Sequence, residues 1–237
     1  MINLNRAFIC GIKGFNISQN EKVFIKKYKP WGIILFSRNI KSVSQVKNLT
    51  KNIKLLLNDP HYPILIDEEG GRVTRLKRIF ENTSFNPRFF GNLYKKNHNL
   101  FKLYFFIHIK QVCYLLRELG ININTVPVLD LFHKKSHKVI GDRAYSSNPK
   151  MVSDIGNICL SLYKKFKICN IIKHIPGHGL SKLDSHYDLP VVKKSKKYLL
   201  KNDFSTFKRK KALLAMTAHI VYYNIDKVNP ATHSKKI

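Results

Sequence analysis

The sequence is poor in acidic residues: 14 Asp and Glu stand against 43 Lys and Arg, giving a formal net charge of +29 over 237 residues. Two explanations fit this imbalance. One is a polyanionic partner, such as nucleic acid or anionic lipid. The other is compositional drift, because Lys, Asn, Ile, Tyr and Phe are all abundant, as expected from an AT-rich genome. The lysines are spread over the whole chain, which favours drift.

Signatures of nucleic-acid recognition are also missing. Short basic clusters occur at 193–197 and 208–211, but no zinc finger, RNP motif or recognition-helix pattern accompanies them. We therefore predict no specific nucleic-acid partner. A basic nucleic-acid-binding protein remains the least favoured alternative.

Cysteine is scarce, and the few cysteines are dispersed: Cys10, Cys113, Cys159 and Cys169. They form no C-x-x-C pair, which is typical of a reduced cytosolic protein with thiols in its core. The N-terminus shows no apolar signal-peptide segment. The most apolar stretch, 101–109, contains Lys102 and His108 and is too short and too polar to span a membrane. We expect a cytoplasmic protein without a membrane partner.

No G-x-G-x-x-G or P-loop follows the first apolar segment, which disfavours a nucleotide-binding sheet. The chain instead alternates short apolar runs, polar loops and helical patterns. The predicted strands are about 7–15, 32–36, 63–66, 121–129, 170–173 and 212–219. The predicted helices are about 18–28, 42–58, 100–119, 149–167 and 198–210. This repeat predicts an α/β fold with a parallel sheet, and the length suits a single domain.

Polar side chains follow the predicted strands: Arg38, Asp67, Asp130, Lys173 and His219. The carboxyl ends of the strands are where a (β/α) barrel or a doubly wound sheet places its active site. The segment 67–75, DEEGGRVTR, is the richest of these loops, with three acids, two arginines and a Gly-Gly turn. We therefore expect a functional site at this edge of the sheet.

The segment 173–190, KHIPGHGLSKLDSHYDLP, follows the fifth predicted strand. Pro and Gly separate His174 from His178, which argues against a helical zinc pair and leaves a loop metal site open. In Asp184-Ser185-His186, a carboxylate that hydrogen-bonds one imidazole nitrogen would fix the tautomer and favour the charged ring. The alternative is a polar loop with incidental histidines.

Five motifs in order carry a family resemblance: WGIILFSRN, ILIDEEGGRVTRL, VIGDRAYS, KHIPGHGLSKLDSH and AMTAHIVY. They resemble the bacterial β-N-acetylglucosaminidases of glycoside hydrolase family three, the cytosolic enzymes of peptidoglycan recycling. The resemblance covers nearly the whole chain. Its most specific part is KH-x-PGHG with a D-S-H that begins six residues after the last histidine.

The resemblance implies roles for individual residues. The implied substrate-binding residues are Asp67, Arg75, Arg143, Lys173 and His174. The implied catalytic residues are His186, a histidine acid/base, and Asp184, which orients it. Structural alternatives exist for neighbouring residues: Arg72 or Arg75 could simply pair with Glu68 or Glu69, and His178 could only brace its loop.

One element of the family pattern is missing from the sequence. In the family, the nucleophilic aspartate belongs to an SDD-type motif after the seventh strand, whereas this chain ends at Ile237. Asp226 is not assigned to this role, because it lies in the loop after the sixth strand. The resemblance therefore implies an incomplete TIM-type (β/α) barrel with about six of eight strands. Residues 1–237 would form one glycoside hydrolase domain without the last two strand–helix units.

The implied activity is hydrolysis of terminal non-reducing N-acetyl-β-D-glucosamine residues from peptidoglycan-derived muropeptides, by a retaining mechanism. The expected partner is an N-acetylglucosamine-containing muropeptide or glycoside. No cofactor and no metal are predicted, and the oligomeric state is left open. Without the nucleophile segment, the second hypothesis is a non-catalytic protein that binds sugar.

Overall fold

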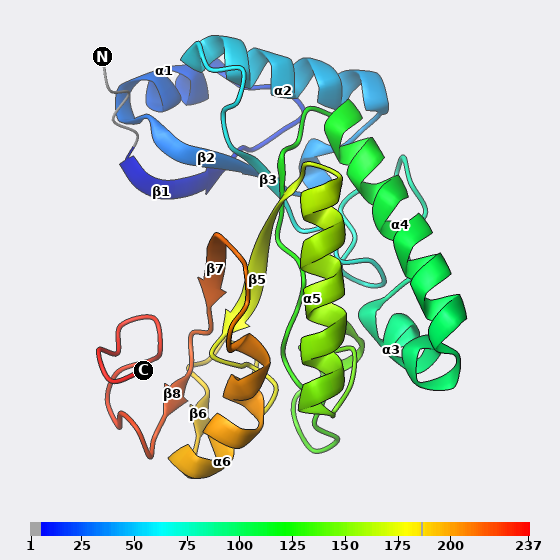
Figure 1. The fold of residues 1–237 in the computed structure, drawn as a ribbon. Helices are drawn as coiled ribbons and strands as arrows, with labels where there is room; N and C mark the ends of the chain where they lie inside the picture. The colour runs from blue at the N-terminus through cyan, green and yellow to red at the C-terminus, as the bar shows by residue number, and fades with distance from the viewer. Residues whose placement is uncertain (1–5, 186) are drawn as a thin grey trace.

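The computed structural model describes residues 6–185 and 187–237. These residues contain a parallel six-stranded sheet in the order β1-β2-β3-β4-β5-β7. Its strands are β1 (Arg6–Gly11), β2 (Pro30–Leu35), β3 (Ile64–Ile66), β4 (Ile123–Asn124), β5 (Cys169–Ile175) and β7 (Leu214–Thr217). The sheet curls but does not close, so that β1 and β7 form its two ends (Figure 1). The prediction of an incomplete parallel barrel is confirmed.

The helices lie outside the curled sheet (Figure 1). They are α1 (Gln19–Tyr28), α2 (Val43–Leu57), α3 (Pro87–Lys96), α4 (His98–Glu118), α5 (Pro149–Lys165) and α6 (Lys196–Lys201), with 3₁₀ turns η1 (Ser37–Asn39), η2 (Gly141–Arg143) and η3 (Asp203–Phe207). The predicted capping box of α1 is present, because the Ser18 hydroxyl accepts from the Glu21 N–H while Glu21 accepts from the Ser18 N–H. Ser42 caps α2 in the same way, but the Gln45 side chain bonds Phe15 and other backbone groups instead of completing a box.

The main core lies between the outer face of the sheet and the helices. Ile33 and Leu35 of β2 belong to the same buried cluster as Val46, Leu49 and Ile53 of α2. These helical residues recur at three- and four-residue spacing, which places them on one face of α2. Each buried aliphatic side chain contributes about 1.5–3 kcal/mol. This packing fixes the sheet and therefore the loops at its carboxyl edge.

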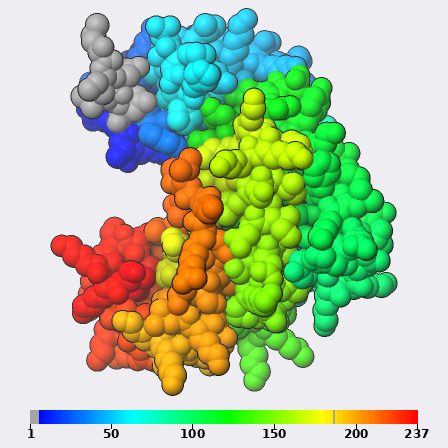
Figure 2. Space-filling model, in the orientation of Figure 1, coloured from blue at the N-terminus to red at the C-terminus, as the bar shows by residue number. Residues whose placement is uncertain are grey.

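The inner face of the sheet carries a second, smaller cluster. Leu65, Ile123 and Ile171 are buried there, while Ile34 and Met216 are only partly buried. In a closed barrel the strands opposite would cover such side chains. In this structure the molecule is open between its N-terminal segment, drawn in blue, and its C-terminal segment, drawn in orange and red (Figure 2).

The structure differs from the predicted elements in four places. The strand predicted for 121–129 is regular only at Ile123–Asn124, because Pro127 has no N–H to donate and the backbone continues through isolated bonds such as Leu129 N–H to the Lys173 carbonyl. The first strand, which was predicted to run to about residue 15, ends at Gly11. The helix predicted for 198–210 is divided between α6 and η3.

The fourth difference is a set of elements that the sequence analysis did not predict. They are α3 and a parallel pair formed by β6 (Val191–Val192) and β8 (Val221–Tyr222). The β6–β8 pair carries its own small core, which includes Leu199, Ile220 and Tyr222. It lies beyond the carboxyl end of β5 (Figure 1). Among the described helices, none is long and apolar enough to cross a membrane.

Candidate active site

Lys173 of β5 is the centre of a charged cluster at the carboxyl edge of the sheet. Its ammonium group lies 3.0 Å from Asp67 Oδ1 and 2.5 Å from Glu69 Oε1, both in the loop after β3. It also donates to the Thr125 hydroxyl at 2.9 Å, and that hydroxyl donates to Asp67. The Lys173 side chain is 2% exposed and that of Glu69 is 0% exposed. A buried ammonium group between two carboxylates therefore joins β5 to the β3 loop.

Arg143 completes the charge balance on the other side of Glu69. Its Nε and Nη2 atoms donate to the two Glu69 oxygens, each at 2.8 Å, in a bidentate pair. Burial alone would raise the pKa of Glu69, but Lys173 and Arg143 outweigh it and lower that pKa to about 2. Burial also raises the pKa of Asp67, and the nearby Lys173, Thr125 and Arg75 again bring it well below its usual range. Both groups are therefore ionised at neutral pH.

Glu68 has a different role from its neighbours, because it organises the loop itself. It accepts from the Arg75 and Leu76 N–H groups at 2.8 and 3.0 Å and from the Asn82 amide at 2.8 Å. Burial raises its pKa, and these hydrogen bonds only partly oppose the shift. The turn beside it requires glycine, since Gly70 has φ +85° and an added Cβ would lie 2.2 Å from the Phe85 carbonyl oxygen. This loop places Asp67 and Glu69 toward Lys173.

A second pair of side chains joins the β4 and β5 loops. Asp130 Oδ2 lies 2.6 Å from His174 Nδ1, and Asp130 Oδ1 accepts from the His178 N–H at 2.6 Å. Burial alone would raise the pKa of Asp130, but His174 and His178 outweigh it and lower that pKa. Asp130 therefore fixes the His174 ring and leaves Nε2 as its remaining hydrogen-bonding atom. His178 Nε2 lies 3.0 Å from the Ser185 hydroxyl, so His178 links the two ends of its loop.

The structure rejects the ion pairs suggested as structural alternatives for the arginines. Arg75 Nη2 lies 3.3 Å from Asp67 Oδ2, and Arg75 reaches Glu68 only through its backbone N–H. Arg72 Nε lies 2.8 Å from Asp142 Oδ1. Glu68 and Glu69 are occupied as described above. Arg75 therefore pairs with Asp67, whereas Arg72 pairs with Asp142.

The five predicted binding residues lie together with Glu68, Glu69, Thr125 and Asp130, and we call this whole group the Asp67 cluster. The five differ in exposure. The side chains of Arg75, Asp67 and His174 are 27%, 15% and 15% exposed, whereas those of Arg143 and Lys173 are 11% and 2% exposed. The first three can touch a ligand, whereas Lys173 and Arg143 hold the carboxylates of Asp67 and Glu69 in place. Two other strand-end residues bond to groups outside this cluster. Arg38 donates to the Ile12 carbonyl, and His219 hydrogen-bonds with the Thr232 hydroxyl.

Of the predicted catalytic pair, the structure describes only Asp184. His186 lies outside the described residues. Asp184 borders an open cavity of about 530 Å³ together with Arg72, His137 and Asp142. Among the described residues, no group of three or more His, Cys, Asp or Glu side chains could hold a metal ion.

The site contains residues to which the sequence analysis gave no role. Glu69 was noted only as a possible arginine partner, Asp130 only as a strand-end acid, and Thr125 not at all. Asp130 had a signal, since it is an acid at the end of a predicted strand. Thr125 had none, because a strand threonine is common and only the fold brings its hydroxyl to Asp67 and Lys173.

We expect the stability of the chain to fall on acidification because of this cluster. The folded-state pKa values of Asp67, Glu69 and Asp130 lie below their usual values, so their contribution is present above about pH 4–5 and is lost as pH falls through the folded-state values. Glu68 acts in the opposite direction, because its pKa is raised. Because three of these groups have lowered pKa values and only Glu68 has a raised one, we expect a net loss of stability on acidification.

Urea midpoints measured between pH 7 and pH 3 check this expectation. The midpoint should decrease below pH 5, and the decrease should be smaller in Glu69→Gln, which removes one of the three titrating groups. A midpoint that is constant over this range, or the same pH dependence in Glu69→Gln, would contradict the assignment.

Comparison with known proteins places these features in a family. The chain is 33% identical over 222 residues to a β-hexosaminidase of Thioalkalivibrio sulfidiphilus, covering 91% of this chain and 62% of that protein. It is 32% identical to a β-hexosaminidase of Nitrosomonas eutropha, covering 95% and 64%. The chain thus spans about three fifths of the length of these relatives.

Solved structures agree with the sequence relatives. Native NagZ from Neisseria gonorrhoeae superimposes with a TM-score of 0.86 at 29% identity, covering 96% of this chain and 66% of that one. Its complex with N-trifluoroacetyl-D-glucosamine superimposes with a TM-score of 0.83 at 30% identity, covering 96% and 67%. Residues 4–237 match the model of the glycosyl hydrolase family 3 N terminal domain. The chain therefore belongs to glycosyl hydrolase family 3.

Proposed function

We propose that the Asp67 cluster binds N-acetylglucosamine, and that the function of this fold is hydrolysis of terminal N-acetyl-β-D-glucosamine residues. The observation that carries the proposal is the partly exposed trio Asp67, Arg75 and His174, which buried charges hold at the carboxyl edge of the sheet. The names of the related β-hexosaminidases support it. So does the NagZ complex with a glucosamine derivative, which is a property of that protein.

Each exposed group suits a part of a sugar. The Asp67 carboxylate can accept hydrogen bonds from ring hydroxyls, and the Arg75 guanidinium can donate to hydroxyl or acetamido oxygens. His174 has one ring nitrogen fixed by Asp130, so its orientation is set before a ligand arrives. Lys173 and Arg143 keep the supporting carboxylates ionised and in place. The cluster is therefore arranged before binding and loses little entropy when a sugar binds.

For catalysis we propose a retaining mechanism with His186 as acid and base and Asp184 as its orienting group. His186 would protonate the glycosidic oxygen while a carboxylate attacks the anomeric carbon, and it would then deprotonate the water that hydrolyses the glycosyl-enzyme. The carboxylates of the described cluster are committed to Lys173, Arg143, His174 or backbone donors. We therefore propose that the nucleophile comes from a part of the barrel outside these 237 residues.

The finer assignments rest on the same proposal. The substrates would be peptidoglycan-derived muropeptides, processed in the cytoplasm during cell-wall recycling. Residues 1–237 would form a single barrel domain that lacks its last two strand–helix units. The incomplete sheet order, with β1 and β7 at its ends, supports this division.

The binding step can be tested by titrating the chain with N-acetylglucosamine in a calorimeter. Charge-assisted hydrogen bonds contribute roughly 1.5–3 kcal/mol, so Arg75→Ala should weaken binding about tenfold or more. Arg78→Ala is the matched control, because Arg78 is three residues away and donates to the Ile40 carbonyl instead. Equal affinities of Arg75→Ala and the parent chain would remove Arg75 from the site, and no binding by the parent chain would remove the proposal.

A further inference from the structure

Helix α4 exposes a row of apolar side chains to solvent. Leu100, Leu103, Tyr104, Ile107 and Tyr114 are each between 39% and 59% exposed, and we call these five residues the outer face of α4. They stand at positions i, i+3, i+4, i+7 and i+14, so they lie on one side of the helix. The side that packs on the core is made by other residues: Phe101, Phe105, Ile109, Val112, Cys113 and Leu116.

The composition of the chain does not explain this row, because the neighbouring helix α5 has no such row. The exposed residues of α5 are all polar: Lys150, Asn157, Ser161, Lys164 and Lys165. Single exposed apolar side chains are ordinary, whereas a contiguous group of them is typical of an interaction surface. The outer face of α4 therefore has the character of a surface that is covered by a partner.

Two phenylalanines extend this apolar surface toward α3. Phe85 is 41% and Phe89 is 39% exposed, and the centres of their rings lie 5.6 Å apart. The Phe85 ring also lies 5.7 Å from the ring of His108, which follows Tyr104 by one helical turn. The exposed apolar surface thus continues from α4 onto the start of α3.

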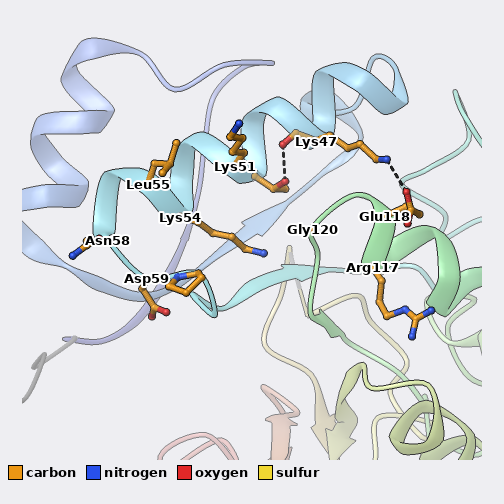
Figure 3. Close-up of a pocket in the computed structure, with 11 residues that line it drawn as sticks. Lys47, Lys51, Lys54, Leu55, Asn58, Asp59, Arg117, Glu118 and Gly120 are labelled. Atoms are coloured by element: carbon orange, nitrogen blue, oxygen red, sulfur yellow. Dashed lines mark hydrogen bonds and ion pairs between the residues drawn. The ribbon is translucent and has the colours of Figure 1, made fainter.

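The segment that carries the outer face has no acidic residue, since no Asp or Glu stands between Glu81 and Glu118. Glu118 itself is already paired with Lys47 of α2 at 2.7 Å (Figure 3). Within the segment, five exposed cations take part in no ion pair between described residues: Lys95, Lys96, Lys102, Lys110 and Arg117. The surface is therefore apolar in the middle and positively charged around it.

This combination favours a lipid surface as the partner. Leu, Ile and Tyr flanked by Lys are typical of helices that lie in the membrane–water interface, where the lysine side chains reach the headgroups. Helix α4 lies at the margin of the molecule (Figure 1), where a fluid surface can meet it without a complementary groove. A second copy of the chain is less suited, because it would bring two sets of unpaired cations together.

The sequence predicted no membrane partner because the stretch 101–109 is too short and too polar to span a bilayer. That reasoning concerns spanning alone. A helix that lies in the interface needs only one apolar side and a charged border, and its length is not the deciding property. The same stretch, with its apolar residues divided between the core and the solvent, meets this requirement.

We propose that the outer face of α4 docks the chain on the surface of an anionic lipid bilayer. Leu103, Tyr104 and Ile107 enter the headgroup region, while Lys102 and Lys110 pair with anionic headgroups. The inference does not rest on the proposed function. The Asp67 cluster lies at the carboxyl edge of the sheet and not on α4, so it stays open to solvent when α4 is docked.

Cosedimentation of the full chain with lipid vesicles tests the proposal. One set of vesicles is phosphatidylcholine with about one third phosphatidylglycerol, and the other is phosphatidylcholine alone. Each lysine near an anionic surface strengthens binding about fivefold. We therefore expect at least about tenfold stronger binding to the anionic vesicles in about 50 mM salt, and loss of most of this preference in about 500 mM salt.

Apolar variants show whether the outer face makes the contact. Leu103→Gln/Tyr104→Gln should weaken binding to anionic vesicles about tenfold or more, because two side chains can no longer enter the headgroup region. Glutamine is a good helix former, so the urea midpoint should stay that of the parent chain. Tyr114→Gln, at the most exposed position of the face, should give a smaller loss and serves if the double variant is less stable.

Lysine variants separate docking from adsorption through net charge. Lys102→Gln/Lys110→Gln should bind anionic vesicles about tenfold more weakly than the parent chain. Lys235→Gln/Lys236→Gln is the matched control, because it removes two exposed lysines near the C-terminus, which lies across the molecule from α4 (Figure 1). This control should bind like the parent chain.

Four outcomes overturn the proposal. They are absence of vesicle binding by the parent chain, equal binding to neutral and anionic vesicles, unchanged binding by both apolar variants, and an equal loss in the two lysine variants. Sedimentation equilibrium without vesicles tests the second copy. Self-association that Leu103→Gln/Tyr104→Gln abolishes, in a chain that binds no vesicles, assigns the outer face to a second copy, whereas a monomeric chain that binds no vesicles leaves it to another protein.

Discussion

Hydrolysis of a chromogenic N-acetyl-β-glucosaminide by residues 1–237 alone is expected to stay close to the rate in buffer. The cluster contains four carboxylates, Asp67, Glu68, Glu69 and Asp130, and each is bonded to cations or backbone donors within the described structure. Asp226 is no substitute, because it accepts from the N–H groups of its own turn and from the Ser234 hydroxyl. None of these five carboxylates is therefore left unpaired for attack on the anomeric carbon.

The expected deficit is large. Loss of the nucleophile from a coupled catalytic unit costs on the order of 10⁴–10⁶ in rate, whereas acid and base assistance contributes roughly 10²–10⁴. In residues 1–237, His186→Ala should therefore change the residual rate very little. A protein that binds N-acetylglucosamine but does not hydrolyse the glycoside would agree with the non-catalytic sugar-binding hypothesis for this polypeptide.

Adding the remaining part of a relative provides the positive control. A chimaera that continues from residue 237 with the remaining segment of the Thioalkalivibrio sulfidiphilus relative should hydrolyse the substrate, and His186→Ala should then reduce its rate about 10²-fold or more. Circular dichroism and binding of N-acetylglucosamine show whether the chimaera is folded. Rapid turnover by residues 1–237 alone, abolished by His186→Ala, would mean that another group is the nucleophile.

Replacing Lys173 with methionine should destabilise the fold by about 3–5 kcal/mol. Removing one partner of a buried ion pair leaves the other charge without compensation, and Lys173 faces two carboxylates, Asp67 and Glu69. Methionine keeps most of the side-chain volume, so lost charge and not a cavity would be the main cause. Urea denaturation at pH 7 measures the change.

Two variants give this measurement its controls. Lys150→Met removes an ammonium group that is 86% exposed and pairs with Asp154 at 2.9 Å, and its effect should stay within about 0.5 kcal/mol. Adding Asp67→Asn to Lys173→Met removes one of the unpaired carboxylates and should recover part of the loss. If Lys173→Met is as stable as Lys150→Met, the buried charge network does not support the fold in the way described.

The sequence predicted the repeating elements well because their signals are local. Apolar runs marked the buried strands, and the Ser18–Glu21 pair marked the start of α1. The carboxyl ends of parallel strands meet at one edge, so the strand pattern alone was enough to expect Asp67 and Lys173 on the same edge of the sheet. The individual ion pairs could not be predicted, because they depend on the distances between loops far apart in the chain.

The missed elements depend on tertiary packing. Helix α3 begins at an asparagine cap with Pro87, which is a good local signal, but Gly91 weakens its helical propensity. The structure explains that glycine, because an added Cβ would lie 1.8 Å from the Tyr145 carbonyl oxygen. The strand predicted for 121–129 was too long because Pro127 interrupts its hydrogen bonding. Asp130 was expected near the site, but its bond to His174 required the fold.

A crystal structure of the chain soaked with N-acetylglucosamine would show whether Asp67, Arg75 and His174 form a binding surface for this sugar. We expect electron density for the sugar with hydrogen bonds to the Asp67 carboxylate and the Arg75 guanidinium, and with Lys173 still between Asp67 and Glu69. Density for the sugar at another place, or an empty cluster at a saturating concentration of the sugar, would contradict it.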